Sequence, residues 1–185
     1  GVTVGKGANS VSGNTAVGQF ALDGNTTGDN NSAFGKSALG ANTTGNFNVA
    51  IGGRALEDCS TGSINTAVGH VALADLTTGG SNVAVGYAAN GSLTTGSQNT
   101  AVGRSALLAS SASNCAAFGY LALTANTTGT RNVAVGANAL DANTTANDNT
   151  AVGYNALGAN TTASNNTAVG SGALDANSTG SNNNA

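Results

Sequence analysis

Residues 149–170 read NTAVGYNALGANTTASNNTAVG, and the phrase NTAVG begins at Asn149 and again at Asn166. The same phrase recurs, with small changes, along nearly the whole chain. If the Ala of each Ala-(Val/Ile/Phe)-Gly triplet is the origin of a repeat, the origins are Ala16, Ala33, Ala50, Ala67, Ala84, Ala101, Ala117, Ala134, Ala151 and Ala168. The numbers of successive origins differ by 17, except for Ala101 and Ala117, which differ by 16. Repetition at a fixed period is the signature of a repeat architecture.

Several positions of the repeat accept few residue types. The second residue after the origin is always Gly, and the fifth is always Ala, followed by Leu in nine copies and by Asn90 in the other. The residue directly after the origin is always apolar, and we expect these residues to stack as the ladder of the structural core: Val17, Phe34, Ile51, Val68, Val85, Val102, Phe118, Val135, Val152 and Val169. Invariant Ala beside this ladder indicates a close neighbour, which we interpret as a second copy of the chain. The alternative is that Ala keeps an exposed face small and flat.

A helix does not suit this pattern, because β-branched residues beside Gly, Asn and Thr are poor helix formers. We predict two short strands per repeat, N-T-A-V-G and x-x-A-L-x, joined by a wide N-T-T-G turn. A step that does not drift indicates coils stacked in register. The predicted fold class is therefore all-β, a parallel β-solenoid of about 11 coils, mostly with 17 residues per coil. We expect residues 1–185 to form a single repeat domain, with a short first coil 3–15, 17-residue coils from 16 onward and one 16-residue coil 101–116.

Stacked coils place equivalent side chains one above another. An asparagine ladder with amide-to-amide hydrogen bonds is expected, with a gap at Cys115, at Asn14, Asn31, Asn48, Asn65, Asn82, Asn99, Asn132, Asn149 and Asn166. Cys59 and Cys115 lie more than three coils apart, too far for a disulfide within the chain, so we expect free thiols, with intermolecular links as the alternative. Asn-Thr-Thr tripeptides, which match the N-glycosylation pattern but are also good turn formers, begin at Asn25, Asn42, Asn126, Asn143 and Asn160.

The composition excludes several functional classes. Only 7% of residues are charged, the net charge is −3, and five Lys and Arg are spread over the chain, so we expect no nucleic-acid partner. No apolar run approaches the roughly 20 residues that span a bilayer, so we expect no membrane contact by this segment. His70 is the only histidine, which leaves nothing for a catalytic triad or a His-based metal site. We therefore expect no enzyme activity, no cofactor and no metal, although Asp29 and Asp148 lie in Asn-rich turns that suit a cation.

The residue directly after each repeat Gly varies most, which indicates a solvent-facing position. One interpretation is a tolerant surface site with no role. The other is a recognition strip, because aromatic rings and guanidinium groups are typical of binding hot spots. The candidate strip residues are Lys36, His70, Tyr87, Arg104, Tyr120 and Tyr154.

The recurring phrase N-T-A-V-G-x-x-A-L resembles the head repeats of trimeric autotransporter adhesins, and similar repeats occur in some phage tail fibres. The shared features are the A-(I/V)-G core and the Ala five residues after its first Ala, and they cover essentially the whole chain. The resemblance implies a left-handed parallel β-roll, three chains side by side, and a surface that binds host matrix or other cells. This chain departs from that family in its usual step, which is longer than the family's.

These observations favour a non-enzymatic structural and adhesive fibre segment, an excerpt of a longer fibre at the cell surface or on a virion. Its expected partners are copies of itself, as a trimer or an end-to-end filament, and host matrix or cell-surface glycans or proteins. The alternative is a subunit of a phage tail fibre or of a self-assembling extracellular filament. A minor alternative is an ice-binding solenoid, suggested by a threonine file at Thr27, Thr44, Thr61, Thr78, Thr95, Thr128, Thr145, Thr162 and Thr179.

Overall fold

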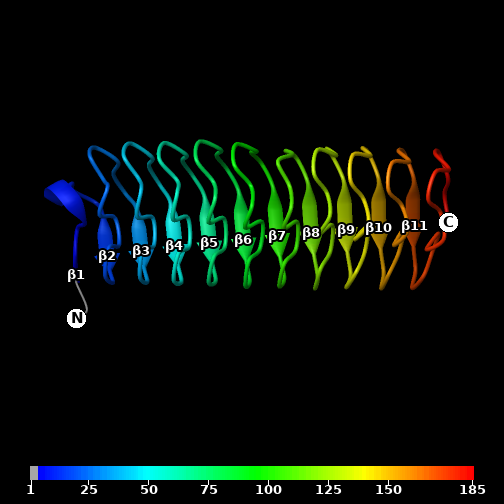
Figure 1. Cartoon of the computed structure of the whole chain (residues 1–185), viewed down its shortest axis with the longest axis horizontal. Helices are drawn as coiled ribbons and strands as arrows, with labels where there is room; N and C mark the ends of the chain where they lie inside the picture. The colour runs from blue at the N-terminus through cyan, green and yellow to red at the C-terminus, as the bar shows by residue number, and fades with distance from the viewer. Residues whose placement is uncertain (1–3) are drawn as a thin grey trace.

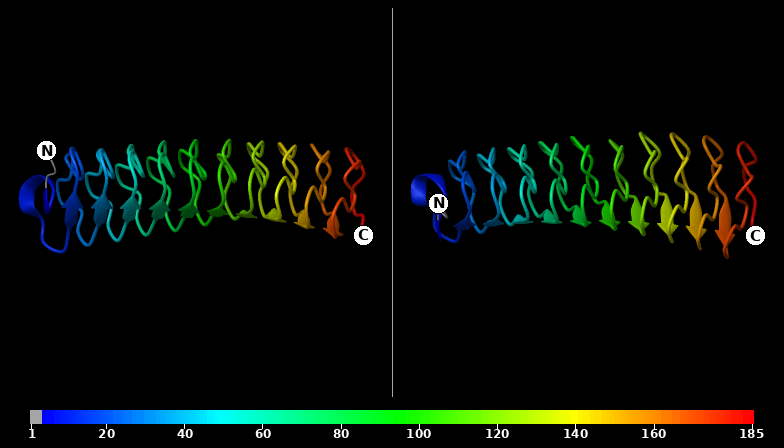
Figure 2. Two further views of the ribbon diagram at one scale, coloured as in Figure 1. Left: turned by 90° about the horizontal axis from the view of Figure 1, so that it is seen from below. Right: turned by 60° about the horizontal axis from the view of Figure 1, so that its bottom comes forward.

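The computed structural model describes residues 4–185, which form an elongated rod of stacked coils (Figure 1). The strands occupy one long side of the rod and the looped turns the opposite side (Figure 2). The elements are β1 (Val4–Gly5), a 3-10 helix (Ala8–Ser10), β2 (Thr15–Val17), β3 (Ser32–Phe34), β4 (Val49–Ile51), β5 (Thr66–Val68), β6 (Val83–Val85), β7 (Thr100–Val102), β8 (Ala116–Phe118), β9 (Val133–Val135), β10 (Thr150–Val152) and β11 (Thr167–Val169). Within these described residues, no helix is long and apolar enough to cross a membrane.

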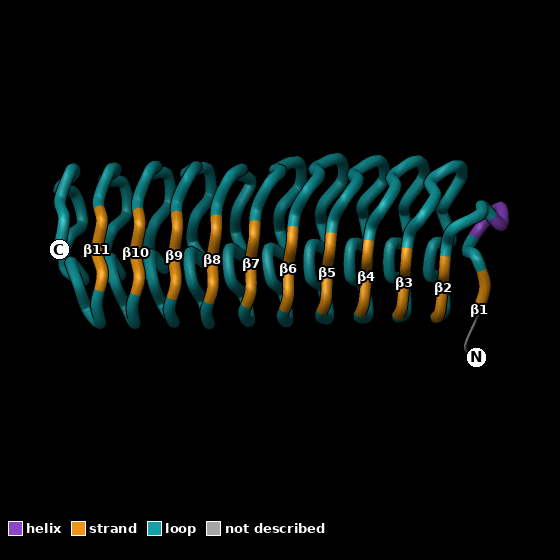
Figure 3. Tube along the Cα trace, turned by 180° about the vertical axis from the view of Figure 1, so that it is seen from behind, coloured by secondary structure: helices purple, strands orange, loops and turns teal. Residues whose placement is uncertain are grey.

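Strands β2 to β11 pair in parallel and in sequence order, which confirms the predicted parallel β-solenoid of mostly 17-residue coils. Every origin Ala pairs with the next origin Ala, as Ala16 does with Ala33. Since adjacent strands lie about 4.8 Å apart, the nine steps from β2 to β11 extend over about 43 Å. The row of strands in Figure 3 follows this axis.

The shortened coil keeps this register, because its missing residue lies at an exposed corner. Ala101 still pairs with Ala117. In other coils a Thr separates the turn residue at position 10 after the origin from the small residue at position 12. Here Ser111 donates to the Thr127 carbonyl as a position-10 residue does, and Ala112 directly after it accepts from the Asn99 amide. The omitted residue is therefore the corner Thr, and the coil wall is unchanged.

Each coil contains one strand rather than the two that we predicted, because the Ala-Leu segment is a turn. Leu22 and Leu39, like the other leucines at this position, have positive φ values of 52° and 53°. A left-handed residue bends the chain so that two successive side chains face the same way. As a result, both Ala38 and Leu39 are fully buried. The turn still bonds to its neighbour, since the Leu39 N–H donates to the Ala55 carbonyl of the next coil at 2.9 Å.

Gly is required at the second position after the origin because the backbone of the adjacent coil lies directly against it. Gly119 has φ 143°, and a Cβ built on it would lie about 2.5 Å from the Gly136 carbonyl oxygen. All ten repeat glycines share this conformation, with φ between 133° and 143°. A side chain here would break both the local backbone and the contact between coils.

The interior is lined by alanine and leucine, and our assignment of the core ladder was wrong. The origin alanines face inward, and nine of the ten are fully buried, whereas the apolar residues after them face outward from the sheet. The outward ladder is half-buried or exposed along its whole length: Val17, Phe34, Ile51, Val68, Val85, Val102, Phe118, Val135, Val152 and Val169. Alternate strand residues point to opposite faces. The sequence shows which residues alternate but not which face is inside.

The close neighbour that restricts the origin to Ala is the opposite wall of the same coil. Origin alanines, Ala-Leu turns and buried Cys59 form one continuous hydrophobic cluster. Because the origin alanines share this cluster with the leucines of the turn, a larger side chain at the origin would overpack the interior. The interpretation that a second chain packs against the Ala face is therefore also wrong, and a neighbouring chain on the sheet would meet the Val ladder instead.

The predicted asparagine ladder is present, and its hydrogen bonds run mainly from backbone to side chain. The Asn31 N–H donates to Asn14 Oδ1 at 2.8 Å, and the Asn31 amide donates to the Gly45 carbonyl. At the predicted gap, the Cys115 N–H still donates to Asn99 Oδ1 at 2.9 Å, and the Cys115 thiol donates to the Gly129 carbonyl at 3.3 Å. The buried amides thus satisfy backbone groups that the narrow coil cannot expose to water.

The N-terminal segment does not form the expected first coil. Val4 and Gly5 pair antiparallel with Val17 and Ala16, and the 3-10 helix follows at the end of the rod (Figure 3). Residue 3, at which we expected this coil to begin, lies outside the described residues. Residues 4–13 therefore fold over the first coil instead of extending the parallel stack.

Candidate functional site

The predicted strip residues lie on the rod surface at position 3 after each origin, directly after the repeat Gly. We call this set the surface column: Gln19, Lys36, Gly53, His70, Tyr87, Arg104, Tyr120, Ala137, Tyr154 and Ser171. All six predicted strip residues are exposed. The Gly conformation turns the chain outward here, which explains why side chains of every size are tolerated.

A backbone ladder fixes the spacing of the surface column. The N–H of each following residue donates to the column carbonyl one coil earlier. Examples are Ser105 N to Tyr87 O at 2.9 Å and Leu121 N to Arg104 O at 3.1 Å. The backbone positions of the column residues are therefore held about 4.8 Å apart along the axis, as strands in a sheet are.

Four neighbouring column residues form a continuous stack. The ring centroids of His70 and Tyr87 lie 5.9 Å apart, with the ring planes at 37°. The Arg104 guanidinium carbon lies 5.8 Å from the Tyr87 ring centroid and 5.7 Å from that of Tyr120. Both distances are within the range of cation–π attraction. The structure therefore brings together His70, Tyr87, Arg104 and Tyr120.

Lys36 and Tyr154 stand apart from this stack. Gly53 separates Lys36 from His70, and Ala137 separates Tyr154 from Tyr120. The His70 imidazole leans over Gly53, since a Cβ built there would lie 3.2 Å from its Nδ1. Tyr154 is the most exposed tyrosine, at 62% against 46% for Tyr120.

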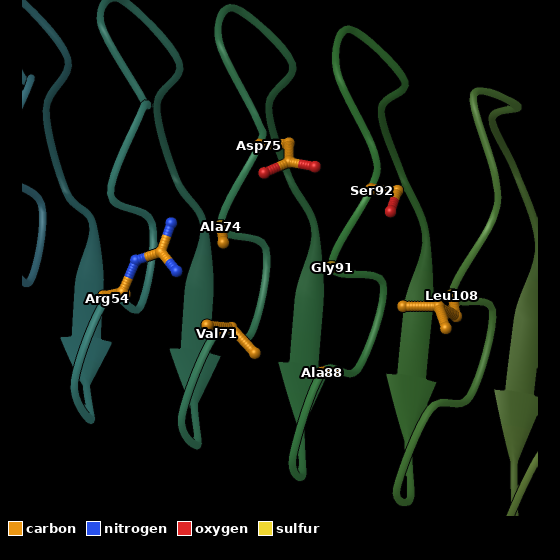
Figure 4. Close-up of a pocket in the computed structure, with 8 residues that line it drawn as sticks. All are labelled: Arg54, Val71, Ala74, Asp75, Ala88, Gly91, Ser92 and Leu108. Carbon is orange, nitrogen blue, oxygen red and sulfur yellow. The ribbon is translucent and has the colours of Figure 1, made fainter.

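A second surface feature, which we did not predict, is a groove of about 160 Å³ across the middle coils (Figure 4). Its lining comes from successive coils: Arg54, Val71, Ala74, Asp75, Ala88, Gly91, Ser92 and Leu108. The groove exists because Ala74 and Gly91 are small where the adjoining coils carry Glu57 and Leu108. Two small residues at one repeat position in consecutive coils were the available signal.

The charged side chains lie on the surface and pair locally. Arg131 bonds to both carboxylate oxygens of Asp148 one coil away, at 2.6 and 2.8 Å, which lowers the pKa of Asp148. Arg54 pairs with Glu57 within its own turn. Asp29 and Asp148, the acids that suited a cation, are seven coils apart and do not share a site. Within residues 4–185, no three His, Cys, Asp or Glu side chains gather as metal ligands.

The remaining candidate groups are inside the coil. Cys59 and Cys115 are free thiols, as expected, and both are buried. Burial raises the pKa of the Cys59 thiol to about 11 and also raises that of Cys115. The asparagines of the glycosylation pattern are fully buried, and each amide donates to the carbonyl three residues later: Asn25, Asn42, Asn126, Asn143 and Asn160. In the folded chain these asparagines stabilise the turns and are not accessible for glycosylation.

The threonine file at the corner is exposed in every coil that has it. The preceding threonines have a different role. The Thr26 hydroxyl, for example, donates to the Thr43 carbonyl at 2.7 Å and thereby links two coils. One free file of hydroxyls thus remains along this edge.

In comparisons with known proteins, no protein-family model matches the chain, and neither does any curated protein or any solved structure. The stacked coils of the chain are consistent with a β-roll repeat.

Proposed function

We propose that the chain is a non-enzymatic fibre segment that displays surface side chains for attachment to cells or host matrix. The observation that carries this proposal is the stack of His70, Tyr87, Arg104 and Tyr120 on a rod whose backbone fixes their spacing. Aromatic and arginine side chains are the residues that most often dominate binding energy at interfaces. Here they are held in line on an exposed edge.

The mechanism of attachment is display on a rigid support. Coil-to-coil hydrogen bonds hold the backbone of each column residue in place, so little backbone entropy is lost when a partner binds. Individual contacts at an exposed edge are weak. Several rods on one surface, or several contacts on one rod, raise the total affinity through multivalency.

Self-association is part of the proposal. The outward Val ladder of the sheet is a continuous apolar stripe, with Phe34, Ile51, Phe118 and Val169 all exposed by 40% or more. Extended apolar surfaces of this kind favour burial against another chain. The proposal includes the trimer and the left-handed roll that the adhesin resemblance implies. It also includes placement at the cell surface or on a virion.

The second candidate is a subunit of a tail fibre or an extracellular filament. The same apolar stripe favours it, because lateral packing of rods also builds filaments. Light scattering of the purified chain separates the two assemblies: discrete trimers support the adhesin form, whereas electron micrographs of long uniform filaments support the alternative.

Adhesion assays test the proposed function. Beads carrying the wild-type chain should bind at least one member of a panel of matrix proteins and cultured cells. A column variant, with five serines, should lose at least about tenfold of this binding; the substituted residues are His70, Tyr87, Arg104, Tyr120 and Tyr154. A matched control, with five serines in the threonine file, should keep it; the substituted residues are Thr44, Thr61, Thr95, Thr128 and Thr162. No binding to any panel member, or equal binding by the column variant, would refute the proposal.

A further inference from the structure

Within the surface column, a guanidinium group already packs against two tyrosine rings. Arg104 lies between the rings of Tyr87 and Tyr120, almost equally distant from the two centroids at 5.8 and 5.7 Å. The two tyrosines belong to alternate coils, about 9.6 Å apart along the axis. An interval of two coils between tyrosine rings is therefore wide enough to hold one guanidinium group.

The same interval recurs one step further along the column. Tyr120 and Tyr154 also lie on alternate coils, but the residue between them is Ala137. The backbone ladder is unchanged, since Asn138 N donates to Tyr120 O at 3.0 Å and Asn155 N to Ala137 O at 3.0 Å. We call the space above Ala137 and between the two tyrosines the tyrosine slot.

We propose that the tyrosine slot binds the guanidinium group of an arginine on a partner polypeptide. The flat cation would take the place relative to Tyr120 and Tyr154 that Arg104 takes relative to Tyr87 and Tyr120. A guanidinium midway between two coils would lie about 5 Å from each ring, within the range of cation–π attraction. The net charge of −3 also favours a cationic partner over an anionic one.

Tyrosine ring resonances provide a direct test, because the three tyrosines of the chain all lie in the surface column. The probe is N-acetyl-arginine methylamide, titrated into protein with labelled tyrosine rings. N-acetyl-citrulline methylamide, which has nearly the same shape without the charge, is the matched ligand. We expect saturable shifts at Tyr120 and Tyr154 with a Kd on the order of 100 mM. Citrulline should produce less than about one fifth of these shifts.

Two variants locate the site. Ala137→Leu fills the slot with an uncharged side chain and should abolish the shifts at both tyrosines. Gln19→Leu places the same side chain at the far end of the surface column and should leave the shifts intact. An unchanged thermal midpoint in both variants verifies that the fold is retained.

Several outcomes would overturn the proposal. Equal shifts with citrulline would show that charge is irrelevant, and shifts that persist in Ala137→Leu would place binding elsewhere. Saturable shifts of all three tyrosines with cellohexaose, and none with the arginine probe, would identify a carbohydrate surface instead.

The inference rests on the proposed role of the surface column as a contact surface, but the two proposals fail separately. If the arginine probe binds the slot and the beads adhere to nothing, the adhesive function is refuted and the slot stands. If the beads adhere through the surface column and the probe does not bind, the slot is refuted and the display function stands.

Discussion

The substitution Asn90→Leu should stabilise the rod. Asn90 occupies the position that holds Leu in the other nine repeats, and it is fully buried. Neither its Nδ2 nor its Oδ1 has a hydrogen-bond partner. An unsatisfied buried amide of this kind destabilises a protein by about 1–3 kcal/mol.

The interior accepts leucine here. The preceding coil carries Leu73 and Leu76 at the positions of Asn90 and Leu93, and both are fully buried. The backbone is also the same, with φ 47° at Asn90 and 50° at Leu73. Burying a leucine side chain contributes about 1.5–3 kcal/mol. Because Leu tolerates positive φ less well than Asn, about 1–2 kcal/mol is offset.

The net gain in unfolding free energy is about 2–3 kcal/mol, which corresponds to a rise of about 5–10 °C in Tm for a chain of this size. Urea and thermal denaturation followed by circular dichroism measure it. Asn90→Ala is the control: it removes the amide and leaves a cavity, so it should change stability by less than about 1 kcal/mol. If Asn90→Leu were no more stable than wild type, the assignment of Asn90 as an unsatisfied core residue would be wrong.

Burial raises the pKa of the Cys59 thiol from 9.0 to about 11, so as the pH rises this thiol loses its proton in the unfolded chain before it does so in the folded chain. The free energy of unfolding should therefore be highest below about pH 9 and fall by up to roughly 2–3 kcal/mol by about pH 11. The Cys59→Ala variant should show a smaller fall. Urea midpoints at several pH values measure this, and a stability that rises over that range would contradict it. Gly119→Ala should lower the unfolding free energy by about 3 kcal/mol or more, because the residue needs φ 143° and its Cβ would meet the Gly136 carbonyl. Gly53→Ala, which lacks both constraints, should be nearly neutral in the same denaturation experiment. Lysine at Val85 and Val135, on the exposed sheet face, should shift self-association towards monomers in sedimentation experiments while changing stability by less than about 0.5 kcal/mol per site. Assemblies of unchanged size would exclude the Val ladder as the contact between chains.

Much of the architecture could be predicted from the period, but the inside of the coil could not. A constant step fixed the parallel register, the asparagine ladder and the surface column. The inward face of the strand was assigned wrongly because Ala16 and Val17 are both apolar, and we assigned the larger side chain to the core. The Ala-Leu turn was missed because leucine rarely adopts positive φ, and only tertiary stacking holds Leu39 there.

The candidate site was predictable in outline for a related reason. Variability at position 3 indicated exposure, and the period placed Tyr87, Arg104 and Tyr120 on successive coils. The contact distances depend on rotamers and required the structure. The groove in Figure 4 was not predicted, because it arises where Ala74 and Gly91 have smaller side chains than the equivalent residues of the adjoining coils.

The shortened coil has a consequence for engineering. It loses the corner Thr, yet Ala101 and Ala117 remain paired and the hydrogen bonds of the wall continue through Ser111 and Ala112. The number of residues at a corner is therefore independent of the axial repeat. Peptide epitopes inserted at these corners should project from one edge of the rod, spaced at multiples of about 4.8 Å along its axis. The distance between two inserted epitopes would then be set by the hydrogen bonding of the β-sheet and by the number of coils between them.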